Sequence, residues 1–410
     1  MRWNGHRKLF RTGFPVKSKT IIYLEALVLS LLCLSLFLFR TDPGQTVVAK
    51  AQKAAYNLGF RDLVPGKPDT ASPSQTEKSY IKWVDFTVTC DAMNQAFRYD
   101  VDTYQKPVHL NWVELLSYLG AKYGGDFSRY KPSDMTTVAN VMLNDGTSME
   151  ELTKDMKYYS YYRQAYGAVL DGMVGEFEAQ IPSSEAPGAY LPSGVTGGAP
   201  GDPETIWVTK YGLKAFSPIA KGFPYSDFDD FGVSRSYGFR RQHLGHDLMG
   251  QVGTPIIAVE SGYVEALGWN QYGGWRLGIR SFDKKRYYYY AHLRKDYPYQ
   301  GGLEEGSYVQ AGDVIGYMGR TGYSRTENTN NIDESHLHFG VQLIFDESQK
   351  EGNNEIWISC YELVKFLSMN RSQAVKVEGT KEWHRIYGTK DPAIPDTVPT
   401  LLPKAPESNP

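Results

Sequence analysis

Histidine is unevenly distributed in this 410-residue sequence, because five of its eight histidines fall between positions 243 and 338. The five are His243, His246, His292, His336 and His338, and Asp247 lies among them. A neutral imidazole is the most common protein ligand for a transition metal, and a carboxylate can complete such a ligand set. The clustering therefore indicates a metal site rather than core packing.

The spacing of the last two histidines predicts a half-buried β-strand. His336 and His338 are separated by one residue, so on a strand both side chains leave the same face. Leu337, Phe339 and Val341 then point to the opposite face, into a core. This alternation is typical of a strand that carries a site on its polar face.

The first pair of candidate ligands has a compatible spacing. His243 and Asp247 are four residues apart, which also suits one face of a strand or a tight strand and loop, whereas His246 has the opposite parity. Two histidines and an aspartate would leave the fourth position of a tetrahedral zinc ion open for water. That arrangement is typical of catalytic zinc sites, since structural sites are usually closed by four protein ligands. The remaining histidines would be available to handle protons.

Three short motifs occur in order across this region. They are His-x-Gly-x-Asp from His243, Ala-His-Leu around His292 and His-x-His-Phe from His336, with Gly253-Thr-Pro-Ile-Ile-Ala-Val and Gln310-Ala-Gly-Asp-Val-Ile-Gly-Tyr-Met-Gly between them. Together they resemble the LytM/lysostaphin-type zinc metallopeptidases. The resemblance covers roughly residues 207–345, and it is specific because several spaced elements agree in order.

The resemblance implies a fold, an activity and roles for five residues. Family members are peptidoglycan endopeptidases built on an antiparallel β-sheet core. His243, Asp247 and His338 are accordingly expected to bind Zn²⁺, and His292 and His336 are expected to be the catalytic histidines. His336 would take the proton of the attacking water, while His292 would orient that water or stabilise the oxyanion.

The sequence departs from the family pattern at one place beside the expected site. Residues 325–334 (RTENTNNIDE) insert a polar loop before the last motif. The insertion leaves the expected ligands intact and bears on substrate preference.

Other residues near the motifs have simpler interpretations. We interpret four histidines as hydrogen-bonded core or surface residues: His6, His109, His246 and His384. Residues 287–290, four consecutive tyrosines, predict a strand of aromatic cross-strand pairs, on which His292 would share a face with Tyr288 and Tyr290. Tyr237 is either a group that holds a substrate carbonyl or a loop aromatic.

The composition excludes one class of function. Lysine and arginine total 44 against 46 aspartate and glutamate residues, for a net charge of −2. Nothing therefore indicates nucleic-acid binding. Aromatic residues make up 14% of the chain and include 30 tyrosines, which suits a β-rich extracellular surface or a cleft for glycan or peptide.

The N-terminal region predicts a membrane anchor. Residues 1–19 carry basic side chains and no acidic one, and residues 21–39 are apolar apart from Glu25 and a few small polar residues. Such a segment nearly spans a bilayer core of about 30 Å. We expect a cytoplasmic leader at 1–19, a transmembrane signal-anchor at 20–40 and an extracytoplasmic remainder. A cleaved signal peptide with Ala49-Lys-Ala51 as its cleavage site is the alternative.

Composition also divides the rest of the chain. Residues 41–77 are predicted to be a tether, 78–180 a mostly α-helical accessory domain, 181–204 a Pro/Gly/Ser linker, 205–385 the zinc metallopeptidase domain and 386–410 a Pro-rich tail. The accessory domain could be a spacer, a wall contact or a partner-binding unit.

Local patterns predict several elements within these domains. Alternation over 81–88 indicates a strand, and an apolar stripe over 112–119 indicates a helix. A capping box at Ser148 predicts a helix that continues through 158–177. Frequent glycines and short alternating segments predict an antiparallel, mainly β catalytic domain, closed by a helix at 357–369.

Two cysteines lie beyond the predicted anchor. Cys90 and Cys360 would be outside the membrane, where a disulfide is permitted, and the sequence does not decide whether they pair.

Together with the resemblance, these observations predict a zinc-dependent endopeptidase of bacterial peptidoglycan stem or cross-bridge peptides, tethered to the outer face of the cytoplasmic membrane. Its partners would be peptidoglycan peptides and the membrane, and a wall-assembly or secretion/conjugation partner would be compatible. One alternative is a catalytically silent membrane-tethered scaffold, against which the intact ligand set counts. A cupin-type metal β-barrel is another, against which the upstream motif at His243 counts.

Overall fold

The computed structural model describes residues 80–183, 205–236, 240–352 and 354–394. The predicted leader, signal-anchor and tether at residues 1–77 lie outside this range, as do Tyr237, most of the predicted linker and the end of the tail. None of the described helices is long and apolar enough to cross a membrane. The predicted anchor at 20–40 therefore stays a prediction.

The first half of the described chain is helical. Its helices are α3 (Cys90–Thr103), α4 (Trp112–Tyr123), α5 (Pro132–Asp145), α6 (Met149–Thr153) and α7 (Tyr159–Leu170), with a short 3-10 helix, η2 (Phe127–Arg129), after α4. The predicted apolar stripe forms the buried face of α4. Ser148 makes the predicted capping box, since its hydroxyl accepts from the backbone N–H of Glu151 and the Glu151 carboxylate accepts from that of Ser148.

Two predicted elements of this half were wrong. Val84, Phe86 and Val88 alternate into the core as expected, but their backbone pairs with no strand among the described residues. The helix predicted from Ser148 through residue 177 is instead two helices, α6 and α7, and α7 ends at Leu170. Gly172 adopts a left-handed φ of 87°, which turns the chain out of the helix and into a strand.

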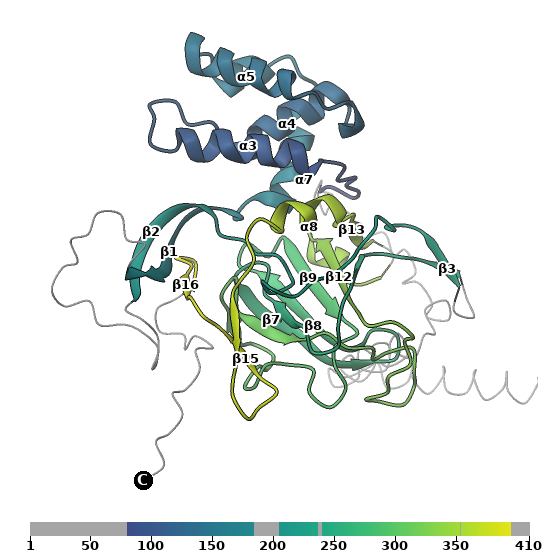
Figure 1. Ribbon diagram of the computed structural model, residues 1–410. Helices are drawn as coiled ribbons and strands as arrows, with labels where there is room; N and C mark the ends of the chain where they lie inside the picture. The colour runs from purple at the N-terminus through teal and green to yellow at the C-terminus, as the bar shows by residue number, and fades with distance from the viewer. Residues whose placement is uncertain (1–79, 184–204, 237–239, 353, 395–410) are drawn as a thin grey trace, which may run out of the picture. The chain divides into compact units, whose positions relative to one another are not determined.

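The second half of the described chain is built on a seven-stranded antiparallel sheet (Figure 1). Its strands are β5 (His246–Met249), β7 (Gly262–Asn270), β8 (Gly274–Ser281), β9 (Arg286–Ala291), β10 (Tyr308–Val309), β12 (His336–Leu343) and β13 (Ile356–Ile358). They run in the order β10-β7-β8-β9-β12-β13, and β5 pairs with β12. The mainly β class predicted for this domain is confirmed.

Smaller sheets surround this one. The ribbon β3 (Ser234–Ser236) and β4 (Arg240–Gln242) leads into the first motif, and β6 (Pro255–Ile257) pairs with β11 (Val314–Tyr317). Farther along the chain, β14 (Ala374–Lys376) pairs with β15 (Trp383–Arg385), and a 3-10 helix, η4 (Glu347–Gln349), follows β12.

The strand register gives the main sheet two different faces. Phe339 pairs with Tyr290, and both rings are fully buried in the core. One residue along, Tyr289 pairs with Gly340 on one side and Gly278 on the other, and these three residues occupy the opposite face. The core face and the site face are thus built from alternate residues of the same strands.

The helical half and the sheet share one hydrophobic core. The contact runs through α8 (Tyr361–Leu367), which lies within the range predicted for the closing helix. Phe366 of α8 stacks on Trp112 at 5.6 Å and meets the ring of Phe97 edge-on at 5.9 Å. The helical half is therefore packed against the sheet rather than held at a distance by a linker.

A three-stranded sheet replaces the predicted boundary between the two halves. Strand β1 (Val174–Pro182) pairs along its full length with β2 (Thr205–Leu213), and its other edge pairs with β16 (Thr389–Lys390). The predicted end of the accessory domain at residue 180 thus lies inside a strand. Alternation of Val174, Glu176 and Glu178 with small and apolar residues was the missed signal.

Both cysteines of the described chain are free and buried. The backbone N–H of Cys90 donates to Glu362 at 2.6 Å, so Cys90 lies near the start of the helix that Cys360 caps. Burial raises the pKa of both thiols, that of Cys360 to about 12. Both thiols therefore favour the protonated form.

Arg286, which forms a buried ion pair within the sheet half, also contacts the helical half. Arg286 of β9 donates to both carboxylate oxygens of Glu260, at 2.7 and 2.9 Å, and to the carbonyl of Ala168 in α7 at 2.9 Å. The hydroxyl of Tyr288 donates to the same carboxylate at 2.6 Å. Burial by itself lowers the pKa of Arg286, but the charge of Glu260 outweighs it and raises that pKa, so the guanidinium remains charged.

Replacing Arg286 by alanine is predicted to destabilise the whole folded unit. Because the substitution leaves the Glu260 carboxylate buried without its cation, we expect the free energy of unfolding to fall by about 3–5 kcal/mol. Urea-induced unfolding of the purified protein measures this, with Lys285→Ala, an exposed neighbour, as the matched control. A loss below about 1 kcal/mol, within the range of ordinary substitutions, would show that the ion pair does not connect the two halves energetically.

Candidate metal centre

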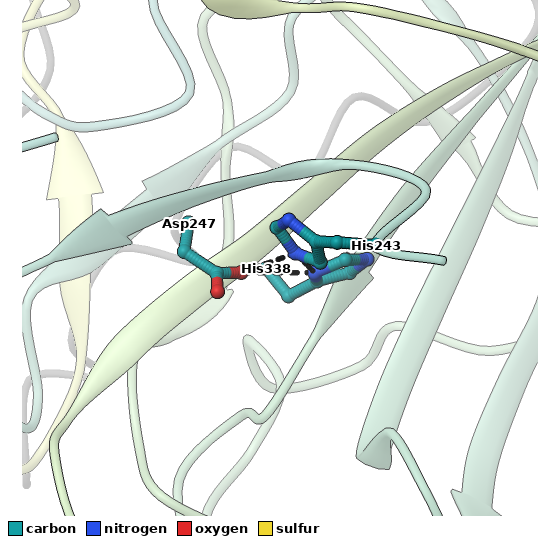
Figure 2. Close-up of side chains that lie close together, drawn as sticks. All are labelled: His243, Asp247 and His338. Carbon is teal, nitrogen blue, oxygen red and sulfur yellow. Dashed lines mark hydrogen bonds and ion pairs between the residues drawn. The ribbon is translucent and has the colours of Figure 1, made fainter. Parts of the chain in front are cut away.

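Three of the predicted ligands converge on one point. His338 comes from β12, Asp247 from the neighbouring strand β5, and His243 from the turn between β4 and β5. Nε2 of His243, Nδ1 of His338 and Oδ1 of Asp247 lie 2.9–3.1 Å from one another. Figure 2 shows the three side chains pointing toward one another from these separate segments.

The donor set fits a zinc ion. Two histidine nitrogens and one carboxylate oxygen are the ligand types of catalytic zinc sites, and tetrahedral ligands at about 2.1 Å from the metal are roughly 3.4 Å apart. Burial lowers the pKa of His338, which keeps its imidazole neutral. Burial also raises the pKa of Asp247, but hydrogen bonds from His243 and His338 outweigh it and hold that pKa well below its ordinary value. The residues thus favour the protonation states that bind a metal.

Two further residues, Asp230 and Arg235, form hydrogen bonds with the ligand side chains and orient them. Nδ1 of His243 lies 3.1 Å from Oδ2 of Asp230, so it donates there and leaves Nε2 free to face the centre. Arg235 donates to the same Asp230 oxygen and, at 2.8 Å, to Oδ2 of Asp247. Asp247 therefore offers Oδ1 to the centre while its other oxygen is occupied.

Neither Asp230 nor Arg235 was predicted as a site residue from the sequence. Asp230 is thirteen positions before His243, and Arg235 lies on the other strand of a short ribbon. The only signal was an acidic pair at Asp229 and Asp230. Which of these carboxylates faces His243 depends on the turn between them, and spacing does not specify that turn.

Steric contacts explain why position 245 of the first motif is a glycine. A Cβ added at Gly245 would lie 2.6 Å from both Cε1 and Nε2 of His338 and 2.9 Å from the carbonyl oxygen of Phe339. Because real Cβ atoms do not approach so closely, only glycine lets this loop lie against the ring of His338. The motif therefore helps to position a ligand 93 residues away in the chain.

The two predicted catalytic histidines flank the ligands. Nδ1 of His336 lies 2.9 Å from the carbonyl of Glu334, and Nδ1 of His292 lies 2.9 Å from the carbonyl of Thr321. Since a carbonyl only accepts, each Nδ1 carries the proton and each Nε2 is left with a lone pair. Nε2 of His336 is 3.8 Å from Oδ1 of Asp247. The ring centres of His292 and His336 are 4.8 Å apart.

The side chain of His292 reaches the site face through a backbone conformation that was not predicted. Strand β9 ends at Ala291, and Tyr288 and Tyr290 face the core, so regular alternation would bury His292 beside them. His292 instead has a φ of 62°, which redirects its side chain to the site face. Burial and the neighbouring histidines His336 and His338 lower the pKa of His292, which favours the neutral ring.

The other described histidines are outside the centre. His246 is buried and bonds Asp227 at 2.8 Å, and His109 bonds Asp100 at 3.0 Å. His384 lies near Glu382. Their interpretation as hydrogen-bonded residues agrees with these contacts, and His6 lies outside the described residues.

The inserted loop at 325–334 is attached to the edge of the site. Asn328 accepts hydrogen bonds from the indole of Trp275 and from the backbone of Asp296, both at 2.9 Å. Asn331 donates to the carbonyl of Tyr323 at 2.7 Å, and the ring of Tyr323 stacks on His292 at 5.9 Å. The loop thus helps to place an aromatic ring beside a candidate catalytic residue.

Comparison with known proteins identifies this part of the chain. Residues 241–351 match peptidase family M23. The L-Ala–D-Glu endopeptidase of Bacillus subtilis is 38% identical over 124 residues, which cover 30% of this chain and 36% of that protein. The glycyl-glycine endopeptidase ALE-1 of Staphylococcus capitis is 36% identical over 120 residues, covering 29% of this chain and 28% of that one.

One solved structure is similar to part of this chain. The catalytic domain of the antimicrobial peptidase lysostaphin from Staphylococcus simulans is 29% identical, with a TM-score of 0.27, and the match covers 34% of this chain and 92% of that domain. An antiparallel sheet that brings together two histidines and an aspartate beside two further histidines defines a metallopeptidase domain. This chain carries a peptidase M23 domain, homologous to lysostaphin and to L-Ala–D-Glu endopeptidase, in a metallopeptidase family that depends on zinc.

Removing one ligand should abolish metal binding without unfolding the protein. Asp247→Ala leaves only two histidine donors, so we expect stoichiometric zinc in the wild-type protein and none retained by the variant after dialysis. Inductively coupled plasma mass spectrometry measures the metal, with His109→Ala as a control at a histidine outside the centre. Zinc retained by Asp247→Ala at the wild-type stoichiometry would contradict the assignment.

A methyl group at position 245 should weaken zinc binding although Gly245 is not itself a ligand. Gly245→Ala forces the loop or the ring of His338 to move, and we expect zinc affinity to fall by about 10- to 100-fold, as for other changes to the support of metal ligands. Competition with a chelator measures this affinity. Gly212→Ala is the matched control, because a Cβ there meets nothing within 4 Å. Equal affinity in both variants would refute the steric account.

Proposed function

We propose that this protein is a zinc-dependent endopeptidase that hydrolyses peptide bonds in bacterial peptidoglycan, in stem or cross-bridge peptides. The observation that carries the proposal is the convergence of His243, Asp247 and His338, with Nε2 of His336 beside the same point. The relatives named for L-Ala–D-Glu and glycyl-glycine cleavage support a peptide of the cell wall as substrate.

The residues of the site would divide the reaction between them. His243, Asp247 and His338 would hold the zinc ion, which when bound polarises the scissile carbonyl and makes water a stronger nucleophile. Nε2 of His336 would accept the proton of the attacking water and later deliver it to the leaving amine. His292, fixed by Thr321, would accept a hydrogen bond from the water at Nε2 and so orient it.

Hydrogen bonds that the two histidines donate to fixed backbone carbonyls support this division of roles. His336 and His292 are each held at Nδ1 by a carbonyl, so neither ring must reorient before Nε2 acts. Both rings are buried, with 8% and 5% of their surface exposed, which limits competing water.

We also propose a location. The basic residues 1–19 and the apolar segment 21–39 would hold the N-terminus in the cytoplasmic membrane, with the peptidase domain on the extracytoplasmic side. This location would give the peptidase access to peptidoglycan.

The test of the activity uses the full chain loaded with zinc, because the helical half shares its core with the sheet. Purified peptidoglycans with directly cross-linked and with glycine-bridged stems are incubated with it, and new amino termini are identified by mass spectrometry. We expect His336→Ala to retain zinc and lose about 10²- to 10⁴-fold in rate, the usual contribution of a general base. His338→Ala should lose zinc and activity together, and His109→Ala should keep both.

These results distinguish the endopeptidase from the catalytically silent scaffold. A zinc-loaded wild-type protein that releases nothing from either wall would contradict the enzyme proposal and favour the tethered scaffold. Equal rates for His336→Ala and the wild type would remove His336 from its proposed role but leave the activity intact.

A further inference from the structure

The segment that carries His292 has an unfavourable backbone conformation at both of its ends. His292 and Asp296 have left-handed φ angles of 62° and 64°, although neither is glycine. Non-glycine residues adopt this conformation at an energetic cost, so it persists only where surrounding contacts impose it. The orientation of His292 therefore depends on what holds residues 292–296 in place.

The first part of this segment is held by the main sheet. The backbone N–H of His292 donates to the carbonyl of Gly273 at 2.8 Å. The backbone N–H of Leu293 donates to the carbonyl of Trp275, on β8, at 3.0 Å. These bonds fix the start of the segment, whereas the backbone N–H of Asp296, at its other end, donates to a side chain.

That side chain belongs to Asn328 of the inserted loop. Its Oδ1 accepts hydrogen bonds from the backbone N–H of Asp296 and from Nε1 of Trp275, each at 2.9 Å. Its Nδ2 donates to the carboxylate of Asp296. Because a carboxamide offers both an acceptor and donors, one residue connects the end of the segment to β8 with three hydrogen bonds.

The inserted loop also contacts the residue that holds the ring of His292. Nδ1 of His292 donates to the carbonyl of Thr321, and Thr321 forms an antiparallel bridge with Asn330. Asn328 itself has a φ of 59°, a conformation in which asparagine is enriched among non-glycine residues. The loop is therefore connected to His292 twice, through the backbone of residues 292–296 and through the acceptor of its ring.

We propose that Asn328 is a positioning residue for peptide hydrolysis. Its carboxamide clamps the end of segment 292–296 to β8 and so keeps Nε2 of His292 directed at the attacking water. This inference deepens the proposed function and rests on the role proposed there for His292. Asn328 acts through the backbone and not through the zinc ligands, so its removal changes turnover while zinc stays bound. The insertion at 325–334 thereby has a part in the chemistry besides its place at the edge of the site.

The experiment removes the carboxamide without opposing the backbone conformation. Asn328→Gly does this, because glycine adopts a positive φ readily. The zinc-loaded full chain is assayed on L-Ala-γ-D-Glu-L-Lys-D-Ala and on pentaglycine. On the peptide that the wild type cleaves, we expect kcat to fall about 10- to 100-fold, the effect of misplacing a group at the reacting centre. KM and the zinc stoichiometry should remain those of the wild type.

Two further sets of variants test the contact itself. Glu327→Gly adds a glycine at an exposed neighbour in the same loop, so it controls for added flexibility and should keep the wild-type kcat. Asp296→Gly removes the other partner of the clamp and should also lower kcat, whereas Asp296→Asn can still accept from Nδ2 of Asn328 and should retain more of it. The double variant of Asn328→Gly and Asp296→Gly should lose less than the two single losses combined.

The outcomes separate this inference from the proposed function. A kcat for Asn328→Gly equal to that of the wild type, a rise in KM alone or a loss of zinc would overturn the inference while the endopeptidase stands. If the wild type cleaves neither peptide, the endopeptidase proposal fails, and hydrogen–deuterium exchange of single amides decides the inference. Faster exchange at His292 and Leu293 in Asn328→Gly, with β12 unchanged, supports the clamp. Exchange at the wild-type rate at both amides refutes it.

Discussion

The alternation of side chains along β12 is the constraint on which the site depends. Leu337, Phe339 and Val341 are completely buried in the core, while His336 and His338 leave the other face of the same strand. A slip of one residue would bury both histidines and expose the apolar side chains. Because β12 pairs with β9 on one edge and with β5 and β13 on the other, the register is specified from both sides. The energy of core packing thereby sets the positions of the candidate ligand and the candidate base.

The remaining geometry comes from residues that constrain those on β12. Asp247 is directly opposite His338 in the register, so pairing of β5 with β12 brings a carboxylate to the histidine. Asp230 and Arg235 then fix which atoms of His243 and Asp247 face the centre. A carboxylate, an arginine and two histidines so close together would be costly to bury if any partner were missing. The contacts that orient the metal donors therefore also compensate their charges. Both effects require the β3–β4 ribbon, because it carries Arg235.

The sequence predicted the parts of this site that depend on periodicity. Spacing of two residues predicted that His336 and His338 share one face of a strand, as they do on β12, because strand alternation is a local property. His243 lies in the turn before β5, so its approach to Asp247 depends on that turn rather than on alternation. The route of His292 was mispredicted, since a single positive φ after Ala291 reverses the alternation and no residue type announces it. Asp230, Arg235 and the clash behind Gly245 depend on contacts between distant segments. The same holds for β1, whose partner lies beyond a Pro/Gly/Ser-rich stretch that resembles an interdomain linker.

The pairing of β1 with β2 limits how the helical half can move relative to the sheet. Pro182 pairs with Thr205, so β1 and β2 are neighbouring strands of one sheet rather than the ends of two separate domains. The helical half is held to the sheet by β1, by α8 and by the contact of Arg286 with Ala168. It therefore cannot swing on a tether toward or away from the histidines. Any contact that its helices make with the wall or a partner would occur at a fixed distance and orientation from the candidate metal centre.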